Sequence, residues 1–76
     1  MEKQLFVGAD VGASRTKVAV LDESCALLGY AVKRSGTDFE RTSSECLEIA
    51  LEMAGEPFRE GLPCVSTGYG RRNVPF

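Results

Sequence analysis

Near the amino terminus, one short stretch combines a carboxylate, a glycine, hydroxyl groups and two cations in the pattern D-x-G-x-x-x-T-K, from Asp10 to Lys17. A carboxylate can hold the hydration shell of Mg²⁺, and a glycine lets the backbone approach a ligand closely. Hydroxyl groups and successive backbone N–H groups along a curved loop can donate to phosphate oxygens. The stretch therefore has the chemistry to bind a polyphosphate with its magnesium ion. The candidates are Asp10, for the metal and as a catalytic group, and Gly12, Ala13, Ser14, Arg15, Thr16 and Lys17, for the phosphates.

The same stretch is also consistent with the turn of a β-hairpin, because turns need glycine and polar residues. Two features favour phosphate binding over a plain turn. A bare hairpin closes with about two to five residues, fewer than residues 10–15 provide, and an unpaired carboxylate at the end of a buried strand costs several kcal/mol of desolvation. The stretch is neither a Walker A loop nor a dinucleotide fingerprint, because both of those lead into a helix. Here the next run is TKVAVL, which is typical of a strand.

A second polar stretch, TGYGR, begins at the last residue of the run LPCVST. It holds two glycines within three residues, which indicates a loop. It is consistent with an ordinary exit from a strand, with Tyr69 over an apolar patch and Arg71 in solvent. Its expected position beside Asp10, derived below, favours a part in ligand binding instead. The candidates in this stretch are Thr67, Gly68, Tyr69, Gly70 and Arg71.

Composition and charge exclude several classes of function. The 76 residues include 9 Lys and Arg against 11 Asp and Glu, with no basic cluster beyond Lys33-Arg34 and Arg71-Arg72, so no nucleic-acid partner is expected. The amino-terminal run is too short and too charged for a signal peptide or a membrane span, which predicts a cytoplasmic protein with no membrane partner. The 3 cysteines form no C-x-x-C pair and there is no histidine, so neither a zinc site nor imidazole catalysis is indicated.

Strand-like and helix-like patterns surround the two polar stretches. A capping box from Thr37 to Glu40 begins a helix, and Gly55 followed by Pro57 ends it. Runs of branched, aromatic and alternating apolar residues predict strands at residues 4–9, 16–21, 27–34 and 62–67. The apolar face of the helix is expected to comprise Phe39, Ser43, Cys46, Leu47, Ala50, Met53 and Ala54.

This order of elements, β-β-β-α-β, predicts a topology. Three strands form an antiparallel meander, and a right-handed crossover through the helix lays the fourth strand parallel to the first. The fold class is therefore α/β with a mixed sheet. The carboxyl ends of the first and fourth strands meet at a switch point, which is where open α/β sheets bind ligands. Asp10 and Thr67 are expected to lie together at that point.

Taken together, the two stretches resemble a known family. A first strand ending in D-x-G-x-x-x-T-K, with this order of elements, resembles the first part of the nucleotide-binding domain of actin, Hsp70 and sugar kinases, which has a ribonuclease-H-like core. More specifically, VGADVGASRTKVAVLD with VSTGYGRRNVPF is similar to the ATP-hydrolysing activators of 2-hydroxyacyl-CoA dehydratases and the ATPase subunits of benzoyl-CoA reductase. The second stretch carries this specificity, because the first fits sugar kinases equally well.

The resemblance implies a nucleotide site and its cofactors. Asp10 would help to position the Mg²⁺ of ATP or ADP, residues 12–17 would form the first phosphate loop, and residues 67–71 would lie beside them. Ala13 and Arg15 depart from the small hydroxyl residues expected in this loop, a change that backbone donors tolerate. Members of the family also bind a [4Fe–4S] cluster between the two subunits of a homodimer, through cysteines later in the sequence. None of the 3 cysteines here matches a cluster ligand.

The resemblance further implies that residues 1–76 are the amino-terminal part of an actin-like ATPase domain whose remainder lies outside this chain. We therefore expect a segment of an ATPase that drives electron transfer to its partner, a CoA-thioester dehydratase or reductase. The segment alone is expected to be catalytically silent, because hydrolysis needs groups on both sides of the triphosphate. Two alternatives stay open: the same segment of a small-molecule, sugar-type kinase, and a non-catalytic module that associates with itself through an open strand edge.

Overall fold

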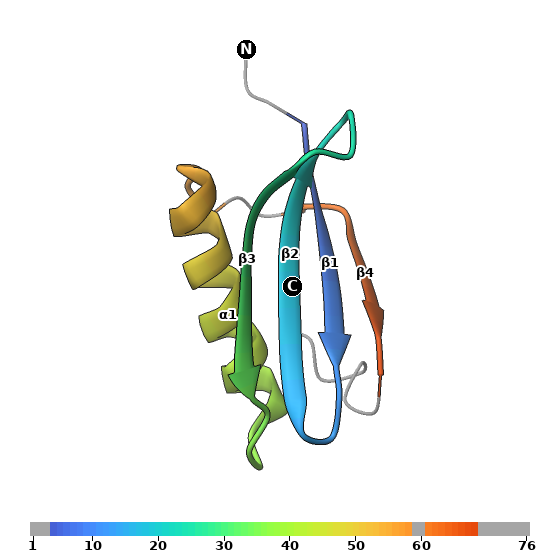
Figure 1. The fold of residues 1–76 in the computed structure, drawn as a ribbon, viewed down its shortest axis with the longest axis vertical. Helices are drawn as coiled ribbons and strands as arrows, with labels where there is room; N and C mark the ends of the chain where they lie inside the picture. The colour runs from blue at the N-terminus through green and yellow to red at the C-terminus, as the bar shows by residue number, and fades with distance from the viewer. Residues whose placement is uncertain (1–3, 59–60, 69–76) are drawn as a thin grey trace.

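The computed structural model describes residues 4–58 and 61–68. Within these residues, four strands form one sheet and one helix packs against it (Figure 1). In chain order the elements are β1 (Leu5–Val11), β2 (Arg15–Asp22), β3 (Leu27–Arg34), α1 (Phe39–Ala54) and β4 (Cys64–Thr67).

The sheet has the strand order β3-β2-β1-β4. β1 and β3 both pair antiparallel with β2, whereas β1 and β4 run parallel. A parallel neighbour needs a long crossover connection, and α1 with its flanking segments supplies it. The predicted α/β class, with a mixed sheet and the order β-β-β-α-β, is confirmed.

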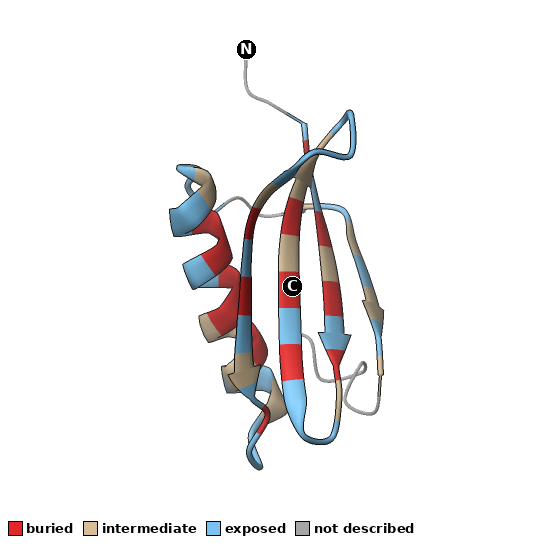
Figure 2. Ribbon diagram, viewed as in Figure 1, coloured by how far each residue is buried: buried red, intermediate tan, exposed pale blue. Residues whose placement is uncertain are grey.

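The core lies between α1 and the one face of the sheet that the helix covers (Figure 2). Successive side chains of a strand point to opposite faces, so every second residue of β1 and β2 faces the helix. Burying one Val or Leu side chain contributes about 1.5–3 kcal/mol, which makes this layer the main source of stability. The buried apolar residues are Leu5, Val7, Ala9, Val11, Val18, Val20, Ala31, Cys46, Leu47, Ala50 and Leu51.

Gly29, in the middle of β3, is the point of closest approach between the sheet and α1. A Cβ atom at this position would collide with the carbonyl oxygen of Ala50 and lie 3.0 Å from the backbone nitrogen of Ala54. Both obstacles are helix backbone, which cannot turn away as a flexible side chain can. The missing side chain at Gly29 therefore sets the distance at which the helix packs on the sheet.

The end of α1 agrees with the sequence prediction, but its first residues do not. The predicted N-cap was Thr37, but the cap is Asp38, whose side chain accepts a backbone hydrogen bond from the first turn. Aspartate and threonine both cap well, so the pattern alone did not separate them. Met53, expected in the core, is 56% exposed, and Leu51 is buried instead. The predicted end is confirmed, because Gly55 has the left-handed φ of 71°.

The strand predicted over 27–34 is confirmed, but the bounds of the others need correction. The strand predicted over 4–9 continues to Val11, the one over 16–21 begins at Arg15, and the one over 62–67 begins only at Cys64. The first error arose because a charged residue, Asp10, looked like the start of a loop. Asp10 instead stands on the solvent side of a strand that goes on to a buried valine.

The other face of the sheet carries exposed apolar side chains. Phe6, Tyr30, Val32 and Val65 are between 40% and 72% exposed. We call the side of the sheet away from α1 the open face.

Across residues 4–58 and 61–68, no helix has the length and apolar character to cross a membrane.

The packing at Gly29 predicts a large effect of a single methyl group. Gly29→Ala should lower the free energy of unfolding by about 3 kcal/mol and Tm by about 10–20 °C, because the new Cβ meets helix backbone. The matched control is Gly8→Ala in β1, where a Cβ would meet nothing within 4 Å. That variant should be neutral or more stable by about 0.5 kcal/mol. Thermal and urea unfolding measure both, and equal effects would contradict the packing argument.

Candidate functional site

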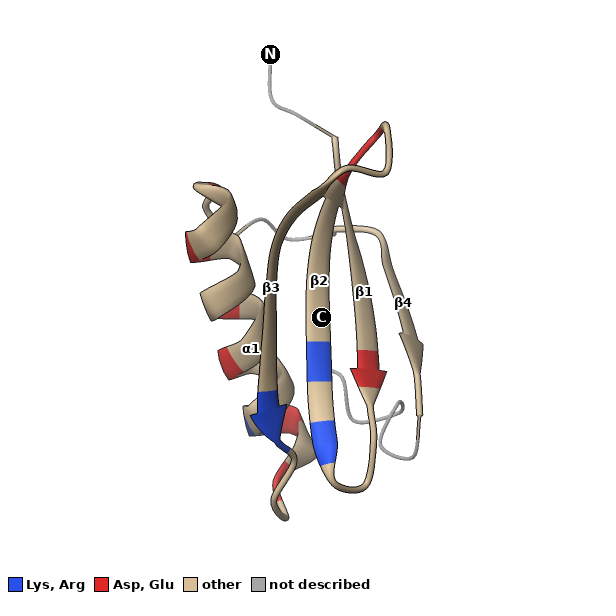
Figure 3. Ribbon diagram, viewed as in Figure 1, with Lys and Arg blue, Asp and Glu red and all other residues tan. Residues whose placement is uncertain are grey.

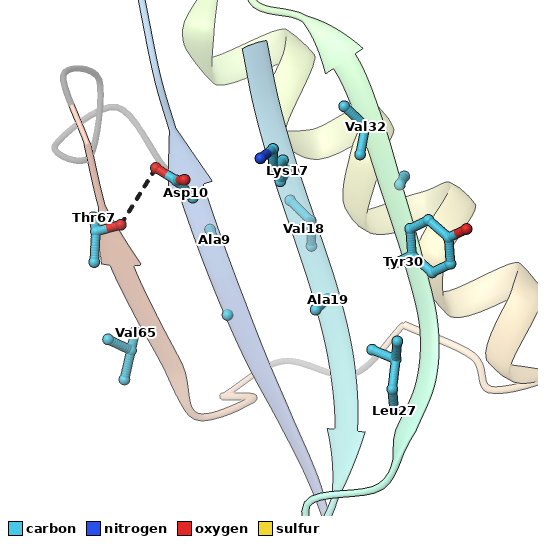
Figure 4. Close-up of a pocket in the computed structure, with 12 residues that line it drawn as sticks. Ala9, Asp10, Lys17, Val18, Ala19, Leu27, Tyr30, Val32, Val65 and Thr67 are labelled. Carbon is cyan, nitrogen blue, oxygen red and sulfur yellow. Dashed lines mark hydrogen bonds between the residues drawn. The ribbon is translucent and has the colours of Figure 1, made fainter.

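The ends of β1 and β4 bring the two polar stretches together. The parallel register places Asp10 opposite Thr67, and the Thr67 hydroxyl donates a long hydrogen bond of 3.4 Å to Oδ1 of Asp10 (Figure 4). Both side chains are exposed on the open face. The juxtaposition expected from the topology is therefore confirmed for Asp10 and Thr67.

Gly68 lies directly after this pair and is required to be glycine. Its φ is 95°, a region that residues with a side chain rarely adopt. A Cβ there would also lie 2.5 Å from the carbonyl oxygen of Val11 and 2.9 Å from Oδ1 of Asp10. The chain leaving β4 thus passes very close to the end of β1. The three other candidates of this stretch, Tyr69, Gly70 and Arg71, lie outside the described residues.

The surroundings of Asp10 differ from the sequence-based expectation. The carboxylate was expected to be desolvated at the end of a buried strand, which would demand a compensating cation. Asp10 is instead exposed, so the desolvation argument is wrong. What the structure offers is an accessible carboxylate with one long hydrogen bond from Thr67.

The turn between β1 and β2 is shorter than expected. The backbone N–H of Gly12 donates to the carbonyl of Arg15 at 2.9 Å, which closes the hairpin around Ala13 and Ser14. The argument that residues 10–15 are too many for a plain hairpin is therefore wrong. A Cβ at Gly12 would lie 2.8 Å from the Arg15 carbonyl oxygen, so the turn itself requires this glycine. In the described part of the chain, the N–H groups of Ala13 and Ser14 donate no hydrogen bond, and both residues are exposed.

Thr16 lies on the opposite face from Asp10. It is fully buried on the helix side, where its hydroxyl is 2.8 Å from the hydroxyl of Ser35. Its neighbours Arg15 and Lys17 point to the open face. The candidates of the first stretch are therefore divided, with Asp10, Lys17 and the tip of the turn accessible and the Thr16 hydroxyl enclosed.

Basic residues gather at this end of β2 and β3 (Figure 3), and the alternation along the strands places Arg15, Lys17 and Arg34 on the open face. Lys17 is opposite Asp10 in the β1–β2 register, and Arg15 is opposite Arg34 in the β2–β3 register. The ion pairs formed by the described residues involve Lys33 and Arg41, and none includes these three cations. Like charges directly opposite on neighbouring strands repel, so an anion bound here would relieve the Arg15–Arg34 pair.

Arg34 was not among the sequence-based candidates. The signal was nevertheless present, because pairing the predicted strands 16–21 and 27–34 as a hairpin brings the start of one beside the end of the other. The structure adds Arg34 to the exposed groups at this site.

A shallow hollow of about 460 Å³ lies along the open face next to these groups (Figure 4). Small residues, Gly8 and Ala19, form its floor, while Tyr30 and Val65 stand at its sides. Asp10, Lys17 and Thr67 line its polar end. The hollow therefore combines a polar end, suited to an anion and its cation, with an apolar body.

None of the three cysteines lines the hollow, although the Cys46 thiol donates to the Thr16 carbonyl oxygen at 3.7 Å on the helix side. Cys46 is buried on the sheet-facing side of α1 and Cys64 is partly buried in β4, and burial raises the pKa of both thiols. Cys25 is exposed in the turn between β2 and β3. Among the residues that the structure describes, no three Cys, Asp or Glu side chains are grouped to hold a metal ion together.

Comparison with known proteins identifies a shared fold. The crystal structure of component A of the (R)-2-hydroxyglutaryl-CoA dehydratase from Acidaminococcus fermentans matches 90% of this chain with a TM-score of 0.72 and 23% sequence identity. The match covers 26% of that chain, so the present chain spans about a quarter of the length of the matched protein. No family model and no curated protein matches the sequence. Over the matched residues, this chain has the fold of component A.

The close approach at Gly68 predicts that its replacement disturbs the site. Gly68→Ala should cost about 2–4 kcal/mol of unfolding free energy, because it adds a clash with the Val11 carbonyl to the strain of a positive φ. The control is Gly61→Ala, which has a φ of 74° but meets nothing within 4 Å and should cost about 1–2 kcal/mol. Urea denaturation measures the difference. Equal losses of unfolding free energy in the two variants would mean that Gly68 does not pack closely against the end of β1.

Proposed function

We propose that this chain forms the phosphate-binding part of a nucleotide site in an ATP-hydrolysing activator protein. The observation that carries the proposal is the row Lys17, Asp10 and Thr67 across three adjacent strands, at the end of the sheet where β1 and β4 stop side by side. Ligands of open α/β sheets bind at such carboxyl ends. The row offers a cation, a carboxylate and a hydroxyl on one accessible surface.

The anion would be held by charge and by backbone donors. Lys17, Arg15 and Arg34 supply positive charge from the open face, and in the described part of the chain the N–H groups of the exposed residues Ala13 and Ser14 donate no hydrogen bond. Hydrogen bonds from such groups to a phosphate are charge-assisted and contribute about 1.5–3 kcal/mol each. The terminal phosphates would therefore lie over the turn, with the remainder of the nucleotide toward the hollow.

The side chain of Asp10 fits a magnesium ion that keeps its water ligands. Its carboxylate is exposed and accepts one long hydrogen bond, from the Thr67 hydroxyl, so it is accessible to accept further hydrogen bonds from metal-bound water. A single carboxylate suits Mg²⁺, which commonly retains several waters and takes other ligands from the phosphates. When bound, the ion would neutralise phosphate charge. Thr67 would keep the carboxylate turned toward it, and Lys17 would hold the phosphates on the other side.

The activity of the whole protein is part of the same proposal. The shared fold with component A and the two motifs support an ATPase of the activator family, whose partner is a CoA-thioester dehydratase or reductase. In that protein, residues 1–76 would be the amino-terminal part of an actin-like ATPase domain. A [4Fe–4S] cluster at a homodimer interface would take its ligands from outside this chain, since Cys25, Cys46 and Cys64 lie on different elements.

Removing the charge of Asp10 should weaken magnesium-dependent binding. Asp10→Asn is expected to lower the affinity for Mg-ATP about tenfold or more, because an amide holds metal-bound water less strongly than a carboxylate. Affinity for ATP in the presence of EDTA should not fall, because without the metal ion the Asp10 carboxylate only repels the phosphates. The control is Asp38→Asn, since Asp38 is an exposed helix cap and asparagine caps equally well. Titration calorimetry measures these affinities, and a similar loss in both variants would remove Asp10 from the site.

Replacing Arg34 should have opposite effects on stability and binding. Arg34→Gln is expected to raise the free energy of unfolding by about 0.2–1 kcal/mol, because it removes repulsion from Arg15. It should also weaken binding of inorganic triphosphate about two- to fivefold at low salt. Arg41→Gln is the control, because Arg41 pairs with Glu45 on α1. If both variants bind triphosphate equally well, Arg34 takes no part in anion binding.

A further inference from the structure

We propose that Ser35 is a positioning residue that holds the turn of residues 12–14 in place from the buried side of the sheet. The proposal rests on the proposed phosphate site and adds a residue that does not touch the ligand. Ser35 lies in the connection between β3 and α1, and its side chain is fully buried. It was not among the candidates that the sequence indicated.

Two hydrogen bonds join Ser35 directly to the turn. Its hydroxyl donates to the carbonyl oxygen of Gly12 at 2.6 Å, and its backbone N–H donates to the carbonyl oxygen of Ser14 at 2.9 Å. The two carbonyls lie on either side of Ala13, so Ser35 holds the backbone of the turn both before and after this residue. The Gly12 and Ser14 carbonyls are thereby held on the buried side. Because the N–H of a trans peptide points opposite to its carbonyl, the Ala13 N–H, which shares a peptide group with the Gly12 carbonyl, is directed away from the helix side.

The direction of the protons makes this a chain of hydrogen bonds. A serine hydroxyl has one proton, and that of Ser35 goes to Gly12. The contact of 2.8 Å between the hydroxyls of Ser35 and Thr16 is therefore donated by Thr16. Donation from Thr16 polarises the Ser35 hydroxyl and strengthens its bond to the turn. This gives the enclosed Thr16 hydroxyl a role that does not require contact with phosphate.

The helix is tied to the same point. The hydroxyl of Thr42 in α1 donates to the carbonyl oxygen of Ser35 at 2.9 Å. The backbone N–H, the carbonyl and the hydroxyl of Ser35 are thus all engaged, with the hydroxyl acting as both donor and acceptor. Ser35 links the turn to α1, and so it holds the proposed donors of the turn in a fixed position relative to the core.

The test compares two buried serines. Ser35→Ala removes the hydroxyl that holds the turn, whereas Ser43→Ala removes a fully buried hydroxyl that has no hydrogen-bond partner among the described residues. In an NMR spectrum of the ¹⁵N-labelled protein, Ser35→Ala should shift the amide nitrogen signal of Ala13, because that nitrogen shares a peptide group with the Gly12 carbonyl. Ser43→Ala should leave the signal in place.

Binding gives the second readout. Ser35→Ala should lower the affinity for Mg-ATP about tenfold, and Ser43→Ala should leave it at the wild-type value. If the two variants give the same Ala13 signal and the same affinity, the proposal is wrong. If the wild-type chain does not bind Mg-ATP, the proposed function fails, and the Ala13 signal alone decides whether Ser35 positions the turn.

A second variant covers the case in which Ser35→Ala does not fold. Thr16→Val keeps the shape of the side chain and the bond from Ser35 to Gly12 but removes the donor to Ser35. It should shift the Ala13 signal in the same direction by a smaller amount. An unchanged signal in Thr16→Val would contradict the proposed chain of hydrogen bonds.

Discussion

The parallel pairing of β1 with β4 is the interaction on which the candidate site depends. It joins short segments, from Val7 opposite Cys64 to Asp10 opposite Thr67, and the chain between them must cross over the sheet. A parallel pair of this length is weak alone, so its stability must come from the helix that forms the crossover. The packing of α1 on Gly29 and on the buried layer of β1 and β2 therefore acts at a distance, because it decides whether Thr67 reaches Asp10.

The same end of the sheet is built differently on its two faces. On the helix side, hydroxyl groups of Thr16 and Ser35 form a neutral, enclosed chain of hydrogen bonds. On the open face, one carboxylate and several cations stand in water. This division follows from the period of two along β2, where buried Thr16 lies between exposed Arg15 and Lys17. Rigidity and charge are thus supplied by neighbouring residues that point in opposite directions.

Sequence reasoning found the elements and the meeting of the two polar stretches, because helical spacing, a terminal glycine and the order of strands carry that information. It misjudged the turn, since Asp10 and Arg15 look like loop residues and only the register shows them within strands. It offered the Thr16 hydroxyl as a donor to phosphate, because the residue type gives no sign that this hydroxyl lies on the helix side. Ser35 was missed because its partners, Gly12 and Ser14, are distant in sequence and are contacted through backbone carbonyls.

The pairing of Lys33 explains why the positive charge at this end belongs to the open face. Lys33 follows the alternation of β3 toward the helix, where it pairs with Glu45 of α1. The hydrogen bond from Lys33, with that from Arg41, lowers the pKa of the Glu45 carboxyl, so this group stays ionised at neutral and mildly acidic pH. The charge of Lys33 is therefore balanced on the helix side. Arg15, Lys17 and Arg34 have no such partner among the described residues, and their combined field faces the surface beside Asp10 and Thr67.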